Sequence, residues 1–172
     1  LKEFFNINPL MINEMRGDGK WYSVYPLGHP FMMMFGAFID APWVINPLLL
    51  ALTVLLTYFL GKEIYDERTG RLAALLASLS PFIFFMSSEF MNHVSTLFYA
   101  MLFLLFFAKT VRGGKWYAPV IAGIGVGMMM NTRPYTALAL AFPFGVYSLW
   151  LLFRNFPTHS WRMALLVLVI VC

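Results

Sequence analysis

The sequence predicts an all-α fold, a polytopic bundle of transmembrane helices with an extracytoplasmic loop segment at its N-terminal end. Hydrophobic residues make up 60% of the 172 residues and charged residues only 12%, whereas soluble domains carry about 25% charged residues. The apolar residues form continuous runs without the alternation of a transmembrane β-barrel. Only helices and closed barrels satisfy their backbone hydrogen bonds in lipid, so these runs are expected to be helices and a soluble domain is excluded.

Six apolar runs are candidate spans, because about 20 helical residues cross a hydrocarbon core roughly 30 Å thick. Pro81 is expected to kink the second run. The sixth run falls short of a full span, and we expect the chain to be truncated at both ends. Residues 44–172 are therefore predicted to form about five full spans and a truncated sixth, with the runs 44–61, 72–88, 90–108, 116–130, 135–153 and 163 onward.

Residues 1–43 are predicted to be part of the first extracytoplasmic loop. Asn, Gly and Pro residues punctuate residues 1–28 and favour turns. The apolar stretch 30–39 starts with Pro30, which suits the start of a helix. This stretch is too short to span a bilayer, so we expect a short helix that lies in the membrane interface.

The basic residues predict the orientation of the bundle. Eight of the twelve Lys and Arg residues fall in three alternate loops, and by the positive-inside rule these loops are cytoplasmic. The N-terminal segment and the intervening loops are then extracytoplasmic. The eight basic residues are Lys62, Arg68, Arg71, Lys109, Arg112, Lys115, Arg154 and Arg162.

An aromatic and polar segment, residues 20–30, leads into the predicted interfacial helix. Aromatic rings beside hydrogen-bonding groups, as at Tyr25 and His29, suit a sugar or a lipid headgroup. The alternative is an aromatic belt that only sets the depth of the protein in the membrane. His29 lies between a glycine and a proline where water meets lipid, which is unusual for a simple anchor.

A carboxylate and an imidazole, Glu89 and His93, fall at the outer ends of two successive predicted spans. Their spacing of four residues places them on one face if both are helical. Such a pair can bind a sugar hydroxyl, move a proton or hold a divalent metal, although metal sites usually have three or four ligands. The alternative is a solvated loop with one helix cap.

Arg133 breaks the positive-inside pattern, because it lies in a short turn on the predicted outer side. A charged residue at membrane depth is a candidate functional residue, and a guanidinium binds phosphate in bidentate fashion. A lipid-linked phosphate is therefore the expected partner. The alternative is an arginine that extends to ordinary lipid phosphates. In the run before this turn, Gly123 and Gly127 predict a face of small residues for close helix packing.

The order of these features resembles the GT-C membrane glycosyltransferases, in the bacterial and archaeal branch similar to protein O-mannosyltransferases and aminoarabinose transferases. The resemblance covers nearly the whole chain and rests on an ordered set of segments rather than on one motif. These segments are WYSVYPLGHP at 21–30, NPLLLALTVLL at 46–56, GKEIY at 61–65, LSPF at 79–82, MNH at 91–93 and NTRP at 131–134.

The resemblance implies a sugar donor carried on polyprenyl phosphate and transfer outside the cytoplasm to a lipid, glycan or protein acceptor. It implies an acidic catalytic base in the first extracytoplasmic loop, upstream of Leu1, and neither Glu14 nor Asp18 matches that position. No cofactor is expected, although a divalent metal is compatible with the family. Membrane lipids are expected partners and nucleic acid is not. The substrate-binding residues implied by the family's pattern are Tyr25, His29, Glu89, His93 and Arg133.

Two other functions remain open on the sequence. A transporter or flippase fragment would place ionisable residues near mid-membrane, whereas these predicted spans are uncharged at their centres and polar residues gather at the outer rim. A non-catalytic membrane subunit would use the same outer polar residues only to contact a partner. An acidic pair just upstream of Leu1 in the complete gene would favour the enzyme.

Overall fold

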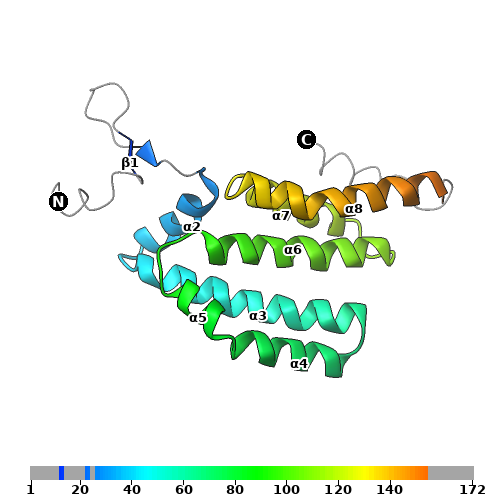
Figure 1. Ribbon diagram of the computed structural model, residues 1–172, viewed down its shortest axis with the longest axis horizontal. Helices are drawn as coiled ribbons and strands as arrows, with labels where there is room; N and C mark the ends of the chain where they lie inside the picture. Colours follow the sequence, from blue (N-terminus) through cyan, green and yellow to red (C-terminus); the bar gives the residue numbers. More distant parts are fainter. Residues whose placement is uncertain (1–11, 14–21, 24–25, 155–172) are drawn as a thin grey trace.

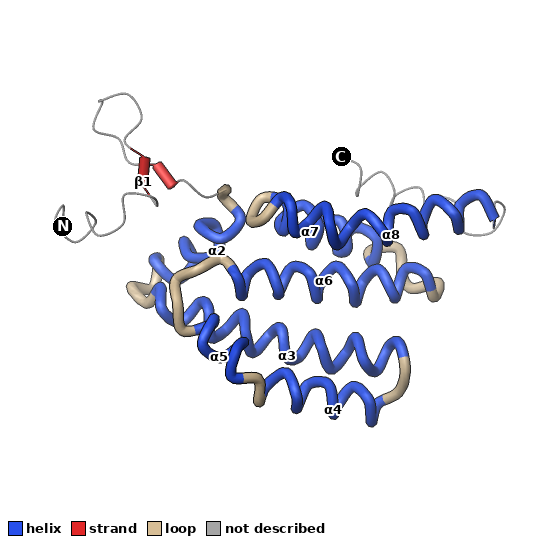
Figure 2. Tube along the Cα trace, viewed as in Figure 1, coloured by secondary structure: helices blue, strands red, loops and turns tan. Residues whose placement is uncertain are grey.

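The computed structural model describes residues 12–13, 22–23 and 26–154, and these residues are almost entirely helical (Figure 2). A short antiparallel pair, β1 (Ile12–Asn13) and β2 (Tyr22–Ser23), precedes the helices. The all-α class predicted from composition is confirmed apart from this pair. The helices are α2 (Gly28–Ala37), the 3-10 helix η1 (Pro42–Val44), α3 (Ile45–Ile64), α4 (Glu67–Ser78), α5 (Pro81–Ser87), α6 (His93–Val111), α7 (Ala118–Met130) and α8 (Pro134–Arg154).

The long helices lie lengthwise beside one another and form a bundle with two distinct ends (Figure 1). Helix α3 packs against α4 and α6, α6 packs against α7, and α7 packs against α8. We call one end the α2 end; it contains α2, the starts of α3, α6 and α8, and the turns 88–92 and 131–133. We call the other the basic end; it contains the turns 65–66 and 112–117 and the helix termini that flank them.

Three helices in the described ranges are long and apolar enough to cross a membrane, and they are Pro42–Ile64, His93–Val111 and Pro134–Leu151. These correspond to the first, third and fifth predicted runs. The fourth run forms only the 13-residue helix α7, which at 1.5 Å per residue is about 20 Å long and shorter than a hydrocarbon core. The prediction of five full spans is therefore confirmed only in part, and the run from 163 onward lies outside the described residues.

The second predicted run is two helices rather than one kinked helix. Helices α4 and α5 meet at an angle of 60°, and the pair qualifies as a fourth span only if it is counted as one broken helix. Ser80 has an extended backbone with ψ of 112°. A residue before proline disfavours the helical region because the proline ring clashes with its backbone, so Pro81 ends one helix and begins the next.

The α2 helix confirms the short apolar helix predicted at 30–39, although it begins two residues earlier, at Gly28. Gly28 lies against the turn 131–133, where a Cβ atom would come within 2.8 Å of the carbonyl oxygen of Asn131 and would overlap the Thr132 hydroxyl. Only glycine fits this close approach. The start of α2 is thereby fixed beside the turn that carries Arg133.

Close packing of α6 and α7 depends on a glycine other than the predicted pair. A Cβ atom on Gly125 would lie 3.0 Å from both the Phe103 nitrogen and the Tyr99 carbonyl oxygen. Gly127 faces open space with nothing within 4 Å, so the predicted Gly123/Gly127 face is wrong at Gly127. The core beside this contact consists of apolar side chains from α6, α7 and α8, namely Phe103, Phe107, Ala122, Val126 and Ala141.

Candidate functional site

Arg133 lies at the α2 end, where its guanidinium is held by two side chains from the start of α6. Its Nε donates to Asn92 Oδ1 at 2.9 Å, and one terminal nitrogen lies 3.2 Å from His93 Nε2. The Asn92 amide nitrogen in turn donates to the Thr132 carbonyl oxygen at 3.4 Å. Asn92 thus joins the start of α6 to the 131–133 turn and orients the guanidinium.

The same interactions leave the start of α6 without a side-chain cap. Asn92 is the N-cap residue and makes no side-chain cap hydrogen bond, although asparagine is among the preferred N-cap residues. Its side chain bonds across to the turn instead. The first backbone N–H groups of α6 therefore add their partial positive charge to the region around Arg133, and α8 begins at the next residue, Pro134.

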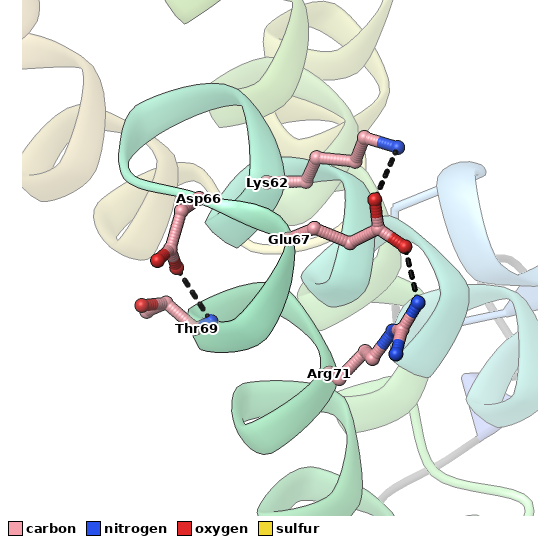
Figure 3. A network of polar contacts seen from close by, with 5 residues as sticks. All are labelled: Lys62, Asp66, Glu67, Thr69 and Arg71. Atoms are coloured by element: carbon pink, nitrogen blue, oxygen red, sulfur yellow. Dashed lines mark hydrogen bonds and ion pairs between the residues drawn. The ribbon is translucent and has the colours of Figure 1, made fainter.

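The positive charge of Arg133 has no carboxylate partner within ion-pair distance among residues 26–154. In that part of the chain the ion pairs are Lys62–Glu67 and Arg71–Glu67, both near the basic end (Figure 3). Arg133 is half-buried, so bulk water solvates it only in part. A half-buried guanidinium with remaining N–H donors and no carboxylate is suited to bind an anion.

Glu89 and His93 are close in space, but they do not share a helical face as the spacing predicted. Glu89 lies in the turn between α5 and α6, whereas His93 is the first residue of α6. The Glu89 carboxylate is near enough to interact electrostatically with His93, and Glu89 is exposed at the surface. No group of three His, Cys, Asp or Glu side chains that could hold a metal ion occurs in the described ranges.

His29 points into the bundle and both of its ring nitrogens have partners. Nδ1 lies 3.1 Å from the Ser95 hydroxyl, and Nε2 lies 3.2 Å from the Phe90 carbonyl oxygen. His29 is only 8% exposed, and this burial lowers its pKa below the usual 6.5, although the bond to the Phe90 carbonyl opposes the shift. This geometry gives His29 a role in holding the 88–92 turn, and substrate binding by His29 stays a prediction.

Asn46 is a site residue that the sequence reasoning missed. It is 3% exposed, and its amide nitrogen donates to the carbonyl oxygens of Glu89 and Met91, the latter at 3.5 Å. Asn46 and His29 together therefore engage three successive carbonyls of the 88–92 turn. The feature of the sequence that could have identified Asn46 is its position, as an amide side chain near the start of an otherwise apolar predicted span.

Four of the five predicted substrate-binding residues thus gather at one end of the bundle. His29 comes from α2, Glu89 from the 88–92 turn, His93 from the start of α6 and Arg133 from the turn before α8. Tyr25 lies outside the described residues. An apolar cavity of about 230 Å³ opens beside this cluster, and it is lined by Leu27, Gly28, Phe31, Met128 and Asn131.

Two of the predicted basic loops share the opposite end of the bundle. Arg112, at the end of α6, donates to the carbonyl oxygens of Glu63 and Ile64 at the end of α3. At the same end, Asp66 caps α4 by accepting a hydrogen bond of 2.7 Å from the Thr69 backbone (Figure 3). The basic residues of these two loops thus lie at the same end of the bundle, and which end faces the cytoplasm stays a prediction.

Comparison with known proteins identifies a family. Residues 27–172 match the family model described as dolichyl-phosphate-mannose-protein mannosyltransferase. No curated protein and no solved structure matches the chain. The match covers all of the described helices and the whole cluster around Arg133. The chain therefore belongs to the dolichyl-phosphate-mannose-protein mannosyltransferase family of GT-C membrane glycosyltransferases.

Proposed function

We propose that this chain forms part of a glycosyltransferase that moves a sugar from a polyprenyl-phosphate donor to an acceptor outside the cytoplasm. The single observation that carries the proposal is the guanidinium of Arg133. It is half-buried, oriented by Asn92 and His93, and without a carboxylate partner among the described residues. An arginine in this state fits the phosphate of a lipid-linked sugar.

The reaction requires stabilisation of negative charge on the departing phosphate. An acceptor hydroxyl attacks the anomeric carbon, the bond from that carbon to the phosphate oxygen breaks, and the lipid phosphate leaves. Arg133 would stabilise the charge that grows on this phosphate, and the uncapped start of α6 would add to the positive potential. An acidic residue would take the proton from the acceptor hydroxyl, and the proposal assigns no residue of this chain to that step.

The surroundings of Arg133 suit the other parts of such a donor. His93 contacts the guanidinium and the Glu89 carboxylate lies near His93, and an imidazole and a carboxylate both hydrogen-bond sugar hydroxyls. The apolar cavity beside Gly28 offers Leu27, Phe31 and Met128 to the first isoprene units of the lipid. Phosphate, sugar and lipid would then contact three neighbouring regions of the α2 end.

Replacing Arg133 with alanine in the full-length protein tests the proposal. Removing one donor that stabilises transition-state charge reduces kcat by about 10²–10³, so we expect a loss of that size in transfer from polyprenyl-phosphate mannose. Arg133→Lys should recover only part of the activity, because an ammonium keeps the charge but loses the bidentate geometry.

The control is Arg68→Ala, which removes an exposed arginine on α4, near the basic end. It should retain turnover close to that of the unchanged protein. Expression level and thermal unfolding of each variant in detergent distinguish a lost contact from a lost fold. Normal turnover by a folded Arg133→Ala protein would remove this residue from the mechanism.

A further inference from the structure

A second cavity lies at the basic end of the bundle, away from Arg133. It has a volume of about 290 Å³ and opens between the ends of α3 and α6 and the start of α7. Three cations and one carboxylate line it. These charged residues are Lys109, Arg112, Lys115 and Glu63.

The cations of this cavity are not neutralised by ion pairs. Within residues 26–154 the ion pairs involve only Glu67, which does not line the cavity. The Lys109 ammonium lies 5.3 Å from the centre of the Phe106 ring, and that of Lys115 lies 5.9 Å from the Tyr117 ring. Contacts with aromatic rings leave the charge of a lysine in place, so three cations and one carboxylate give the cavity lining an excess of two positive charges.

The backbone around the cavity is held in place by specific contacts. The Arg112 guanidinium donates to the last carbonyls of α3, at Glu63 and Ile64. Gly113 has a φ of 81°, a region that favours glycine. A Cβ atom on Gly114 would lie 2.6 Å from the Lys109 carbonyl oxygen. This tight turn sets Lys109 and Lys115 on the same cavity.

The start of α7 opens onto the same cavity. Tyr117, its N-cap residue, and Ala118 line the cavity, and no side chain caps the helix. The partial positive charge of a helix N-terminus favours anions. This contribution has the same sign as that of the three cations.

The depth of the cavity points to a lipid rather than to a soluble anion. The candidate spans that flank it end at Ile64 and Val111, so the cavity lies where a bilayer would reach its headgroups. Trp116 is 66% exposed beside Tyr117, and exposed Trp and Tyr are enriched at that level. Basic pockets between transmembrane helices bind lipid phosphates.

We propose that this cavity binds the phosphate headgroup of an anionic phospholipid, with Lys109 and Lys115 as its principal contacts. The site is separate from that of the donor and does not depend on the proposed reaction. The bound lipid would hold the ends of α3 and α6 and the start of α7 together at the membrane surface.

Titration of phosphatidylglycerol into the delipidated full-length protein in neutral detergent, followed by native mass spectrometry, tests the proposal. Each basic residue near an anionic headgroup contributes about fivefold in affinity, so Lys109→Gln with Lys115→Gln should weaken binding about 30-fold. Phosphatidylcholine should bind weakly to both proteins. Inorganic phosphate at the same concentrations should not displace the lipid.

The matched control is Lys62→Gln with Arg68→Gln, which also removes two positive charges from the basic end but at residues outside the cavity lining. It should change binding less than twofold. Glu63→Gln removes the carboxylate that lines the cavity and should tighten lipid binding. If the double lysine variant does not fold, tighter binding by Glu63→Gln supports the proposal and unchanged binding contradicts it. Equal losses in the two double variants, or displacement by inorganic phosphate, would overturn the proposal.

Discussion

Replacing Gly70 with alanine tests how closely α4 packs against α3. A Cβ atom on Gly70 would lie 2.5 Å from the Tyr58 carbonyl oxygen and 2.9 Å from the Lys62 backbone nitrogen. On the facing helix, a Cβ on Gly61 would lie 2.7 Å from the Gly70 Cα. All of these atoms belong to helix backbones, so a rotamer change cannot relieve the clash.

The size of the effect follows from these distances. Ordinary contact begins at 3.4 Å, so α3 and α4 must separate by roughly 1 Å to accept the methyl group. Overpacking of this kind costs about 1–3 kcal/mol, and the rigid surroundings place Gly70→Ala at the upper end. The better helix propensity of alanine returns about 1 kcal/mol. The net loss of about 2 kcal/mol corresponds to a fall of roughly 4–8 °C in the unfolding midpoint.

Gly127→Ala provides the same chemical change without the clash, because nothing lies within 4 Å of the position that its Cβ atom would take. This variant should gain up to about 1 kcal/mol from helix propensity. The assay heats the purified full-length protein in one detergent and measures, by size-exclusion chromatography, the fraction that remains folded at each temperature. The packing argument is refuted if Gly70→Ala unfolds at or above the midpoint of the unchanged protein, or if both variants shift in the same direction.

Three further predictions concern the α2 end and the orientation of the bundle. Burial lowers the pKa of His29 in the folded state, so below about pH 6.5 the unfolded state binds more protons and the free energy of unfolding should fall as the pH drops through that value. His29→Gln should make the unfolding midpoint less dependent on pH over this range. The same dependence on pH in both proteins would contradict the prediction. Asn46→Leu removes the donor for two turn carbonyls and should cost about 1 kcal/mol, so an unchanged unfolding midpoint would argue against its role. Cysteines placed at the exposed positions 89 and 135 should react with an impermeant reagent outside intact cells while a cysteine at 112 does not, and the reverse pattern would invert the bundle.

Composition and the continuous apolar runs together were enough to predict the all-α membrane class. The low content of charged residues excludes a soluble domain, and uninterrupted apolar runs satisfy their backbone hydrogen bonds in lipid only as helices. The positions of the apolar runs also located α3, α6 and α8. The sequence-based prediction was wrong where backbone geometry decides the structure, as at Pro81. Whether a proline bends a helix or ends it depends on the backbone conformation of the residue before it. Ser80, the residue before Pro81, has an extended backbone, so the helix ends there.

The sequence by itself determined which chemical groups are present at the α2 end, and it singled out Arg133 because that cation departs from the charge pattern of the loops. Only the tertiary structure decided how those groups are used. Asn92 leaves its own helix uncapped to hold Arg133, and His29 turns inward to hold a backbone turn. These partners lie 41 and 61 residues apart in the chain, and contacts over such separations arise from helix packing rather than from any local pattern.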